Sequence, residues 1–439
     1  MNGKSIKVAI IGGGAAGCFA AVNLKRQCPG ADVSVYESGR KILAKVAVTG
    51  GGRCNLTNSF AEVRSLESVY PRGHRLMKRL LKEFGHSDVC HWFGDRGVRL
   101  VTQPDQCVFP ESQDAMEIVN VLASGMRRSG VNVFVSHRVT GIRDMSVAGG
   151  SPRFSLSFSA GADGNAVPDT EADIVLVTSG GSPKPGGLAM LDGLGLEIIA
   201  PVPSLFSFDI GAPESLDDPS RKSRDPGLSA LMGTVVDNAS VGLSGTKFRA
   251  SGALLITDWG MSGPAVLKLS SYAARYLAGN GWRGKMMVDW LGEMTAEDAS
   301  SMLSCMAESA PARQLSSVGP AGLNGRLWAF LLERAGLPCT KRWNELGKKG
   351  QNRLADVLTC DVYPVVGRNR FKGEFVTCGG VALPGIDPKT LESRAHPGLY
   401  FAGEVLDVDA VTGGFNLQAA WSMAYVAVCA ISRRISKSF

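Results

Sequence analysis

The clearest pattern of hydrophobic and polar positions lies at the start of the chain. A mostly apolar run at 6–11 is typical of a buried parallel strand, and a glycine-rich turn at 12–17 opens a helix. A second apolar strand at 33–36 ends at Glu37, twenty residues after Gly17. This order of strand, turn, helix, strand and acid predicts a βαβ unit that binds a dinucleotide.

Each glycine of the turn has a distinct expected task. Gly12 makes the tight turn, Gly14 lets the backbone approach a pyrophosphate, and Gly17 lets the helix lie close on the strand. The helix N-terminus then points its free N–H groups at the phosphates. The carboxylate of Glu37 accepts hydrogen bonds from a ribose diol and repels a 2′-phosphate, so this turn favours FAD or NAD over NADP.

The next part of the chain continues a domain of helices and strands. The segment 38–58 has little periodicity and is expected to be a long ordered loop, and such loops inside domains are usually functional. Helical patterns follow at 74–84 and 113–129. Extended runs at 131–135 and 173–178 predict strands, the first of them in the same parallel sheet.

The pattern changes in the middle of the chain. Short extended segments occupy the region after about residue 201, and mostly helical sequence runs from about 296 to 335. We interpret this region as an inserted domain with a β part followed by a helical part. Extended segments return at 374–377 and 398–403, and an apolar helix over 416–433 is expected to complete the first domain.

The fold class expected from this organisation is α/β, with a Rossmann-like domain split in sequence by an insertion. The assigned boundaries are 1–195 and 363–439 for the two parts of the first domain and 196–362 for the insertion, divided into a β-rich part at 196–290, a helical part at 291–345 and a return at 346–362.

Composition narrows the class of protein. The chain has 439 residues, of which 44% are hydrophobic and 20% charged, as is ordinary for a soluble globular protein. The net charge of +7 is not concentrated in a run, so it allows nucleic acid without implying it, and we expect no nucleic-acid partner. The ten scattered cysteines contain no CxxC pair, which argues against zinc and dithiol sites and favours reduced thiols in a cytoplasm.

No membrane span is expected. The glycines at 12–14 would break a signal helix, and the apolar run at 419–431 is too short for a bilayer core of about 30 Å.

Only one complete nucleotide fingerprint is present, so other segments must decide between a plain NAD-binding protein and a flavoprotein. The glycine-rich segment 39–58 directly follows the ribose-binding acid, where the chain of a flavoprotein runs toward the flavin. The segment 403–416 would place a second helix N-terminus in the active-site cleft. Such a terminus can stabilise the negative charge of a reduced flavin.

At these segments the chain resembles a known family. The motifs are TGGGRCNLTN at 49–58, VTCGGV at 376–381 and GLYFAGEVLDVDAVTGGFNLQAAWS at 398–422. They are similar to signatures of bacterial FAD-dependent oxidoreductases of the BaiN type, also called the aminoacetone oxidase family. The resemblance extends over nearly the whole chain and implies a split FAD domain with an inserted β-barrel-like domain and a small helical domain.

Two departures from the family pattern concern the substrate side. Family members commonly have a Thr-His pair where this chain has Thr257-Asp258, so no role of that histidine carries over. The loop at 181–187 is shorter than usual, which implies different substrate access.

The predicted cofactor site combines the fingerprint with the two later segments. The resemblance implies that the backbone of Val139 contacts the adenine. Arg40 and Lys41 either flank the adenosine or phosphates or form a solvated charge pair. The predicted FAD-binding residues are Gly12, Gly14, Ala15, Ala16, Gly17, Glu37, Ser38, Arg40, Lys41, Gly51, Gly52, Arg53, Cys54, Asn55, Val139, Gly403, Glu404, Gly413, Gly414, Phe415 and Asn416.

Catalytic residues are not identified by the sequence. Cys54 is the weak candidate, because a thiolate beside a flavin could form an adduct, but without a resolving partner we favour a packing role. Asn55, Thr57 and Asn58 are expected to form hydrogen bonds around the ring or to cap the loop. None of the five histidines has a recognisable catalytic spacing, and no metal site is expected.

The expected function is an FAD-dependent oxidoreductase that transfers hydride between flavin N5 and a small organic substrate. An NAD(P)H-dependent reductase, with NADH or NADPH as a transient co-substrate, and an amine oxidase that uses oxygen both remain open. Two other classes are an FAD-binding partner or modifier of RNA and a plain NAD-binding protein without flavin. The substrate is expected between the FAD domain and the insertion; the oligomeric state is not readable.

Overall fold

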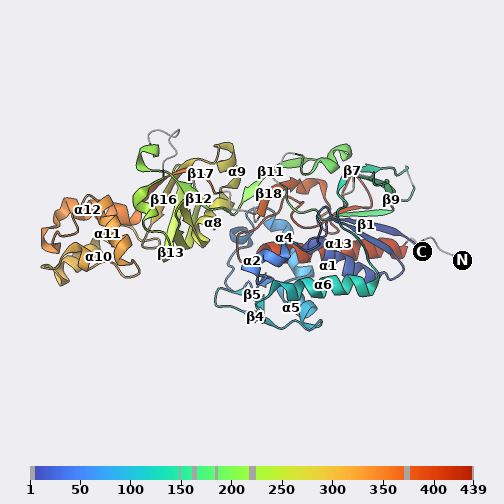
Figure 1. The fold of residues 1–439 in the computed structure, drawn as a ribbon, viewed down its shortest axis with the longest axis horizontal. Coiled ribbons are helices and arrows are strands. Elements are labelled where there is room, and N and C mark those ends of the chain that lie inside the picture. Colours follow the sequence, from blue (N-terminus) through green and yellow to red (C-terminus); the bar gives the residue numbers. More distant parts are fainter. Residues whose placement is uncertain are drawn as a thin grey trace. The chain divides into compact units, whose positions relative to one another are not determined.

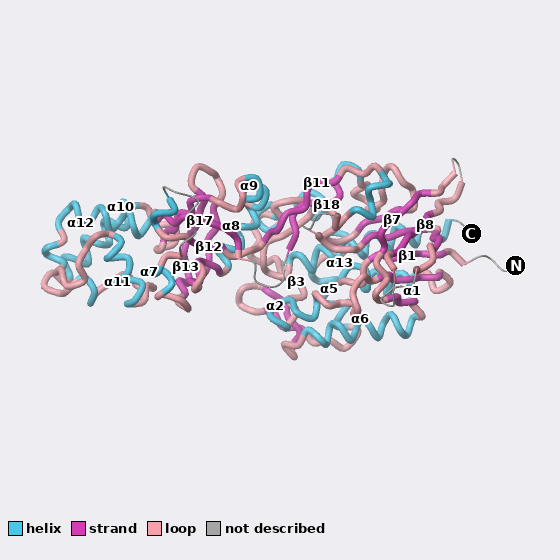
Figure 2. The backbone as a smooth tube through the Cα atoms, turned by 45° about the horizontal axis from the view of Figure 1, so that its top comes forward, coloured by secondary structure: helices cyan, strands magenta, loops and turns pink. Residues whose placement is uncertain are grey.

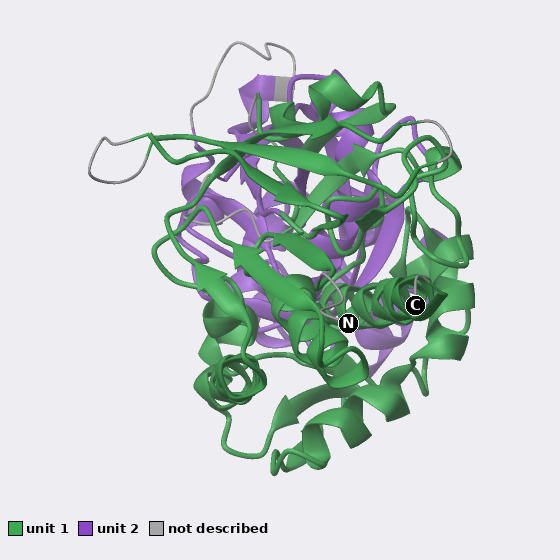
Figure 3. Ribbon diagram, turned by 90° about the vertical axis from the view of Figure 1, so that its right-hand side faces the viewer, with its two compact units in different colours: residues 1–202, 376–439 green, residues 203–375 purple. Residues whose placement is uncertain are grey.

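The computed structural model describes residues 5–147, 150–160, 166–182, 186–216, 224–369 and 376–437. The chain divides into two compact units, residues 1–202 with 376–439 and residues 203–375 (Figure 3). The first unit is therefore discontinuous in sequence. The boundaries assigned from the sequence at 195/196 and 362/363 stay a prediction.

A five-stranded parallel sheet forms the centre of the first unit. Its strand order is β19-β10-β1-β2-β6, with bounds Leu399–Phe401, Ile174–Val177, Lys7–Ile11, Asp32–Tyr36 and Asn132–Phe134. All neighbouring strands are parallel, and β1 pairs with β2 on one side and with β10 on the other. β10 is buried along its whole length, as its apolar sequence requires. The Rossmann-like fold is confirmed, and so are the strands predicted at 131–135 and 173–178, of which only the first was expected in this sheet.

Helices cover this sheet. The longest is α13, and it lies beside α1 (Figure 1). One helix in the described part of the chain, α13, is long and apolar enough to cross a membrane, but 67% of its apolar window is buried inside the protein. That burial is typical of a helix in a protein core. The main helices of the unit are α1 (Ala15–Gln27), α4 (His74–Glu83), α5 (His86–Gly94), α6 (Ala115–Ser129) and α13 (Phe415–Lys437).

Three small sheets complete the first unit, and the sequence analysis missed most of their strands. One contains β3, β5 and β4, another β7, β8 and β9, and the third pairs β11 with β18. β3 and β5 are buried but have only two and four residues, and β4 and β9 have three residues each and are partly exposed, so none of these four contains enough of a period to indicate a strand. Their bounds are Thr57–Asn58, Cys107–Pro110, Leu100–Thr102, Val139–Asp144, Phe154–Phe158, Thr170–Ala172, Ile198–Ser204 and Val376–Val381.

The expected loop at 38–58 contains short ordered elements. A 3-10 turn at Val46–Val48 is followed by α2 (Thr49–Gly52) and then by β3. Inside α2, Gly50 and Gly51 have φ of 58° and 69°, a left-handed conformation that favours glycine. The segment is thus ordered, as expected, but it is not free of secondary structure.

The second unit combines a closed barrel with a helical part (Figure 2). The barrel order is β12-β15-β14-β13-β16-β17, with bounds Phe208–Ile210, Gly260–Ser262, Arg249–Ile256, Val235–Leu243, Gly284–Asp289 and Asp361–Arg368. The short helix α7 (Pro226–Ser229) precedes β13, and α8 (Pro264–Tyr272) and α9 (Ala274–Gly279) follow β15. The helical part contains α10 (Ala296–Ser309), α11 (Gly325–Arg334) and α12 (Gly347–Thr359). The β-barrel-like insertion and the helical subdomain are confirmed.

A buried polar cluster joins the helical part to the barrel. Asp361, at the start of β17, is 3% exposed and accepts hydrogen bonds from Arg334 Nε of α11 at 2.9 Å and from the Tyr363 hydroxyl at 2.5 Å. The Trp290 indole also donates to this carboxylate, at 3.2 Å. The loop at 181–187, which the sequence indicates to be shorter than usual, lies partly outside the described residues.

Candidate functional site

The turn between β1 and α1 lies at the carboxyl edge of the parallel sheet. Because β2 and β10 flank β1 on opposite sides, this is a point where the strand order switches, and such crevices bind ligands in open α/β sheets. Gly12 has φ of 109°, and a Cβ there would lie 2.4 Å from the carbonyl oxygen of Thr178. A Cβ at Gly17 would lie 2.0 Å from the carbonyl oxygen of Gly12. Both positions therefore exclude a side chain within the protein itself.

Gly14 differs from these two glycines. A Cβ there would meet no described atom within 4 Å, so the space beside its backbone is open. Gly14 is also the N-cap of α1 and provides no side-chain hydrogen bond to the first turn, which contains Ala15 and Ala16. The helix N-terminus thus presents uncapped N–H groups beside open space, an arrangement that suits a pyrophosphate.

Glu37 follows β2 and lies against the same turn. One carboxylate oxygen accepts a hydrogen bond from the Gly13 N–H at 2.8 Å, and the other accepts from the Gly39 N–H at 2.6 Å. The Ser38 hydroxyl is also within 3.2 Å of it. These contacts fix the carboxylate beside the mouth of the turn, where the fingerprint predicts the ribose.

Val139 is brought toward Glu37 by the preceding residues. The His137 N–H donates to the carbonyl oxygen of Glu37 at 2.8 Å, and the Ser136 N–H donates to that of Gly39 at 2.8 Å. Val139 itself is buried and begins β7. The predicted adenine contact of its backbone therefore falls in the neighbourhood of the predicted ribose site and stays a prediction.

The fold joins the two glycine-rich segments that the sequence analysis singled out. The Asn58 side chain donates to the Gly413 carbonyl at 3.0 Å, and the Thr57 hydroxyl donates to Gln418 Oε1 of α13 at 2.5 Å. In the amide orientation that satisfies both of its groups, Asn55 donates to the Thr57 carbonyl at 3.1 Å and accepts from the Gly414 N–H at 3.2 Å. The segment 49–58 therefore lies against the N-terminus of α13.

Arg53 holds the glycine loop in shape. Its guanidinium lies over the Phe109 ring, 4.5 Å from the centroid, and its Nε donates to the Gly50 carbonyl at 3.1 Å. Gly51 and Gly52 border open space, since a Cβ at either position would meet nothing within 4 Å of the described protein. This open backbone surface is available to a ligand.

Cys54 is fully buried and has φ of 61°. Burial raises the pKa of its thiol to about 12, although a hydrogen bond with Thr49 acts in the opposite direction. The thiol is therefore neutral at physiological pH, and a neutral thiol is a poor nucleophile. This environment suits the packing role.

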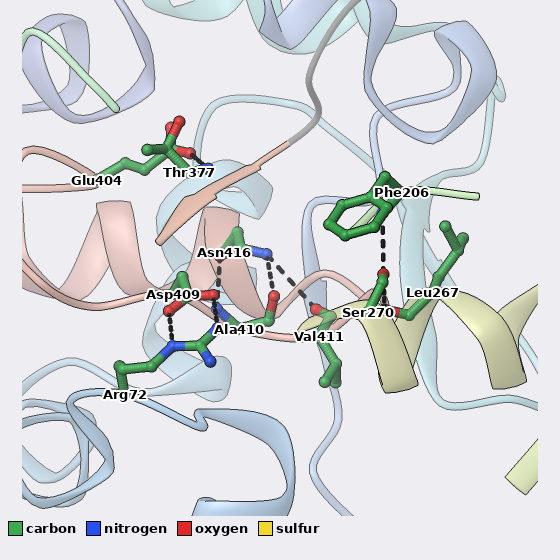
Figure 4. A network of polar contacts seen from close by, with 10 residues as sticks. All are labelled: Arg72, Phe206, Leu267, Ser270, Thr377, Glu404, Asp409, Ala410, Val411 and Asn416. Carbon is green, nitrogen blue, oxygen red and sulfur yellow. Dashed lines mark hydrogen bonds and ion pairs between the residues drawn. The ribbon is translucent and has the colours of Figure 1, made fainter. Parts of the chain in front are cut away.

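The end of β19 closes the other side of the α1 N-terminus. A Cβ at Gly403 would lie 3.3 Å from the Cβ of Ala16, and the preceding Ala402 N–H donates to the Val177 carbonyl at 3.0 Å. Glu404 accepts a hydrogen bond from the Thr377 N–H at 2.5 Å (Figure 4). Burial raises the pKa of the Glu404 carboxyl above its ordinary value, against the lowering effect of Lys45 and of backbone hydrogen bonds from Thr377 and Gly181.

An ion pair that the sequence analysis missed anchors the loop before α13. Arg72 Nε contacts Asp409 Oδ1 at 2.5 Å and its Nη2 contacts Oδ2, with side-chain exposures of 11% and 0% (Figure 4). Asn416 bonds both backbone groups of Ala410 at 2.9 Å. The Tyr70 hydroxyl donates to the Phe415 carbonyl at 2.9 Å. The only sequence signal was the place of Asp409 within the motif at 398–422.

Two of the predicted cofactor residues make no polar contact with the segments described above. Arg40 and Lys41 are exposed and form no hydrogen bond or ion pair with the described residues, which suits a solvated pair as well as a ligand contact. The described residues also contain no group of three His, Cys, Asp or Glu side chains that could hold a metal ion.

A family model described as the HI0933-like protein Rossmann domain matches residues 6–430 of this chain. The chain belongs to this family. It is an FAD-dependent oxidoreductase and a flavoprotein of the type that the sequence motifs indicated. The open backbone at Gly14, the uncapped N-terminus of α1 and the fixed carboxylate of Glu37 fit FAD. The interpretation as a plain NAD-binding protein is wrong.

Individual relatives align over nearly their whole length. The chain is 29% identical to the 3-dehydro-bile acid delta(4,6)-reductase of Clostridium scindens, covering 98% of this chain and 99% of the relative. It is 28% identical to the ribosomal RNA dihydrouridine synthase of Haemophilus influenzae, covering 97% and 98%. Among solved structures, the 3-ketosteroid-delta4-(5alpha)-dehydrogenase of Rhodococcus jostii gives a TM-score of 0.48 at 13% identity, with 98% of each chain covered.

Proposed function

We propose that this flavoprotein reduces a carbon–carbon double bond conjugated to a carbonyl group, with NADH or NADPH as the electron donor. The observation that carries the proposal is the chemistry shared by the names of two full-length relatives. A 3-dehydro-bile acid delta(4,6)-reductase and a dihydrouridine synthase both add two hydrogens across such a double bond. Overall, NAD(P)H and a proton are consumed, the carbon–carbon π bond is replaced by two C–H bonds, and NAD(P)⁺ is released.

The residues of the first unit divide the work of holding FAD. We assign the pyrophosphate to Gly14 and the first turn of α1, and the ribose to Glu37. We assign the ring to the joined segments 49–58 and 413–416, whose backbone borders open space at Gly51 and Gly52. The bound flavin supplies hydride chemistry at N5.

The protein contributes orientation and electrostatics around this site. The N-terminus of α13, which begins at Phe415, favours negative charge beside it through the helix dipole. Asn55 and Asn58 hold that terminus against the glycine loop. Cys54 is neutral and buried, so we assign it no proton or electron transfer.

An anaerobic absorbance titration tests the proposal. The purified flavoprotein is reduced with NADH and separately with NADPH, and the reduced form is then mixed with 2-cyclohexenone, a 3-oxo-Δ4 steroid, uridine or a uridine-containing RNA oligonucleotide. We expect bleaching of the flavin bands by one nucleotide and their return on addition of a conjugated alkene, with formation of the saturated product. Aminoacetone with oxygen is the control for the other open class, the amine oxidase.

The alternatives give different results. Reduction of the flavin by aminoacetone, with hydrogen peroxide formed in air and no reduction by either nucleotide, would establish an oxidase. Rapid reduction by a nucleotide without reoxidation by any conjugated alkene would refute the proposed substrate class.

A further inference from the structure

The helix α4 carries a row of exposed basic side chains. Arg75, Lys78, Arg79 and Lys82 follow the spacing i, i+3, i+4 and i+7, which places them on one side of the helix. All four are exposed, whereas Leu76, Met77 and Leu80 on the other side are buried. We call these four residues the basic face of α4.

The charges of the basic face have no ionic partner in the part of the chain that the structure describes. None of the four side chains forms a hydrogen bond or an ion pair with the described residues, in contrast to the neighbouring Arg72. The acidic side chain within α4 is Glu83, at its end. Four positive charges therefore lie along about 10 Å of helix, given a rise of about 1.5 Å per residue.

The helix starts beside the loop that precedes α13 and the predicted cofactor residues 413–416. Arg72 is paired with Asp409, and a Cβ at Gly73, the N-cap of α4, would lie 2.5 Å from Val408 Cγ2. The Val69 carbonyl accepts a hydrogen bond from the Val411 N–H at 2.9 Å. The basic face thus leads away from the loop that precedes α13, and it belongs to the same compact unit.

Charged side chains of both signs follow beyond the end of α4. The adjacent Phe84 ring stacks on Tyr425 at 4.3 Å, and Arg26 is near enough to Tyr425 to affect its pKa. After the effect of burial, Arg26 and Arg128 lower the pKa of Arg96, whereas Asp95 raises it. The charge beyond α4 is therefore of mixed sign, and the four cations of the basic face carry the inference.

From these observations we infer that the basic face of α4 binds the phosphate backbone of an RNA strand whose base enters the flavin site. The inference rests on the proposed function and specifies its substrate as a uracil base within RNA. A row of cations over about 10 Å matches two or three successive phosphates of a single strand better than it matches one small carboxylate. An anionic membrane is a poorer match, because a membrane-surface helix needs a free apolar side and that of α4 is buried.

Fluorescence anisotropy tests the inference. It measures the binding of a labelled, uridine-containing single-stranded RNA of twelve nucleotides over a range of salt concentrations. The variant R75Q/K78Q/R79Q/K82Q is compared with the wild-type holoprotein. We expect a loss of affinity of at least about tenfold at 100 mM salt. We also expect the slope of the logarithm of the binding constant against the logarithm of the salt concentration to become shallower by about 0.7 for each lost phosphate contact.

A matched control removes four exposed cations from the other unit. The variant R326Q/K348Q/K349Q/R353Q changes the net charge equally on α11 and α12 and should retain wild-type affinity. Equal loss in both variants, or no RNA binding by the wild type, would overturn the inference. So would a basic face that binds anionic lipid vesicles while its substitution leaves RNA binding unchanged.

The same variant separates this inference from the proposed function. FAD content, melting temperature and reduction of 2-cyclohexenone by the quadruple variant should equal those of the wild type, because the four side chains are exposed and form no hydrogen bond or ion pair with the described residues. If RNA binds through α4 but no conjugated alkene is reduced, the proposed function is refuted and the assignment of the basic face as an RNA-binding surface is supported. If alkenes are reduced and RNA does not bind, only the surface assignment fails.

Discussion

Gly14 and Gly17 lie in the same turn, but a methyl group would have opposite consequences at the two positions. At Gly17 it would clash with the backbone of Gly12, and a backbone atom cannot shift without a large cost in free energy. At Gly14 it would enter open space, and the backbone angles of φ −85° and ψ −163° suit alanine. Gly17 is therefore required for packing within the protein, whereas Gly14 keeps space open for the ligand.

We therefore expect Gly17→Ala to destabilise the apoprotein by about 2 kcal/mol or more and Gly14→Ala to change its stability by less than about 0.5 kcal/mol. Gly14→Ala should instead weaken FAD binding by about 10- to 100-fold, because its methyl group occupies the pyrophosphate approach. Chemical denaturation and fluorescence titration with FAD measure the two quantities. Unchanged FAD affinity in Gly14→Ala would contradict the assigned pyrophosphate position.

Cys54 gives a prediction about reactivity. Because burial raises its thiol pKa to about 12, we expect no alkylation by iodoacetamide in the native protein between about pH 7 and pH 8.5. The exposed Cys305 and Cys360 provide the internal control. Cys54→Ala should keep the rate of flavin reduction within about threefold of wild type. A hundredfold lower rate of flavin reduction at normal FAD content would show that the thiol takes part in catalysis.

Among the elements, the connection between α4 and the loop before α13 depends on one buried ion pair. Arg72→Met removes the guanidinium from a carboxylate with no exposed surface, so we expect a loss of about 3–5 kcal/mol in the free energy of unfolding. The exposed pair Arg99–Glu111, whose side chains are 87% and 61% exposed, is the control, and Arg99→Gln should cost less than about 1 kcal/mol.

A double-mutant cycle with Asp409→Leu completes this test. The double variant should lose less free energy of unfolding than the two single variants lose together, because it leaves no buried charge without its partner. Additive losses would show that the two side chains act independently.

The elements that the sequence predicted are those whose signal is local. β1, the glycine turn, α1 and β2 are consecutive, and their apolar period and glycine spacing are contained in about thirty residues. β4 and β5 gave no such signal because they have only three and four residues, although β5 is fully buried.

The same limit applies to the candidate site. The motifs at 49–58 and 398–422 indicated which segments matter, but not that Asn58 bonds Gly413 or that Arg72 pairs with Asp409 across more than three hundred residues. Such contacts depend on the packing of α13, and no periodicity in either segment encodes its partner.

For the whole molecule, the division into two compact units predicts two unfolding transitions in calorimetry. FAD at a hundredfold excess over its Kd should stabilise only the transition of the first unit, by about 2.7 kcal/mol. Asp361→Asn should lower only the other transition, because it disrupts the cluster of Arg334, Tyr363 and Trp290. A single transition that responds to both changes would contradict independent units.

The split of the first unit has a consequence for synthesis on the ribosome. All six barrel strands are translated before β19 and α13, although β19 completes the parallel sheet and α13 packs on α1. Until residues 399–437 emerge, β10 has an open edge and the predicted flavin end of the site is missing. We therefore expect that a nascent chain acquires FAD only after residues 399–437 have left the ribosome, so that bound flavin marks a chain in which the two separate parts of the first unit have joined.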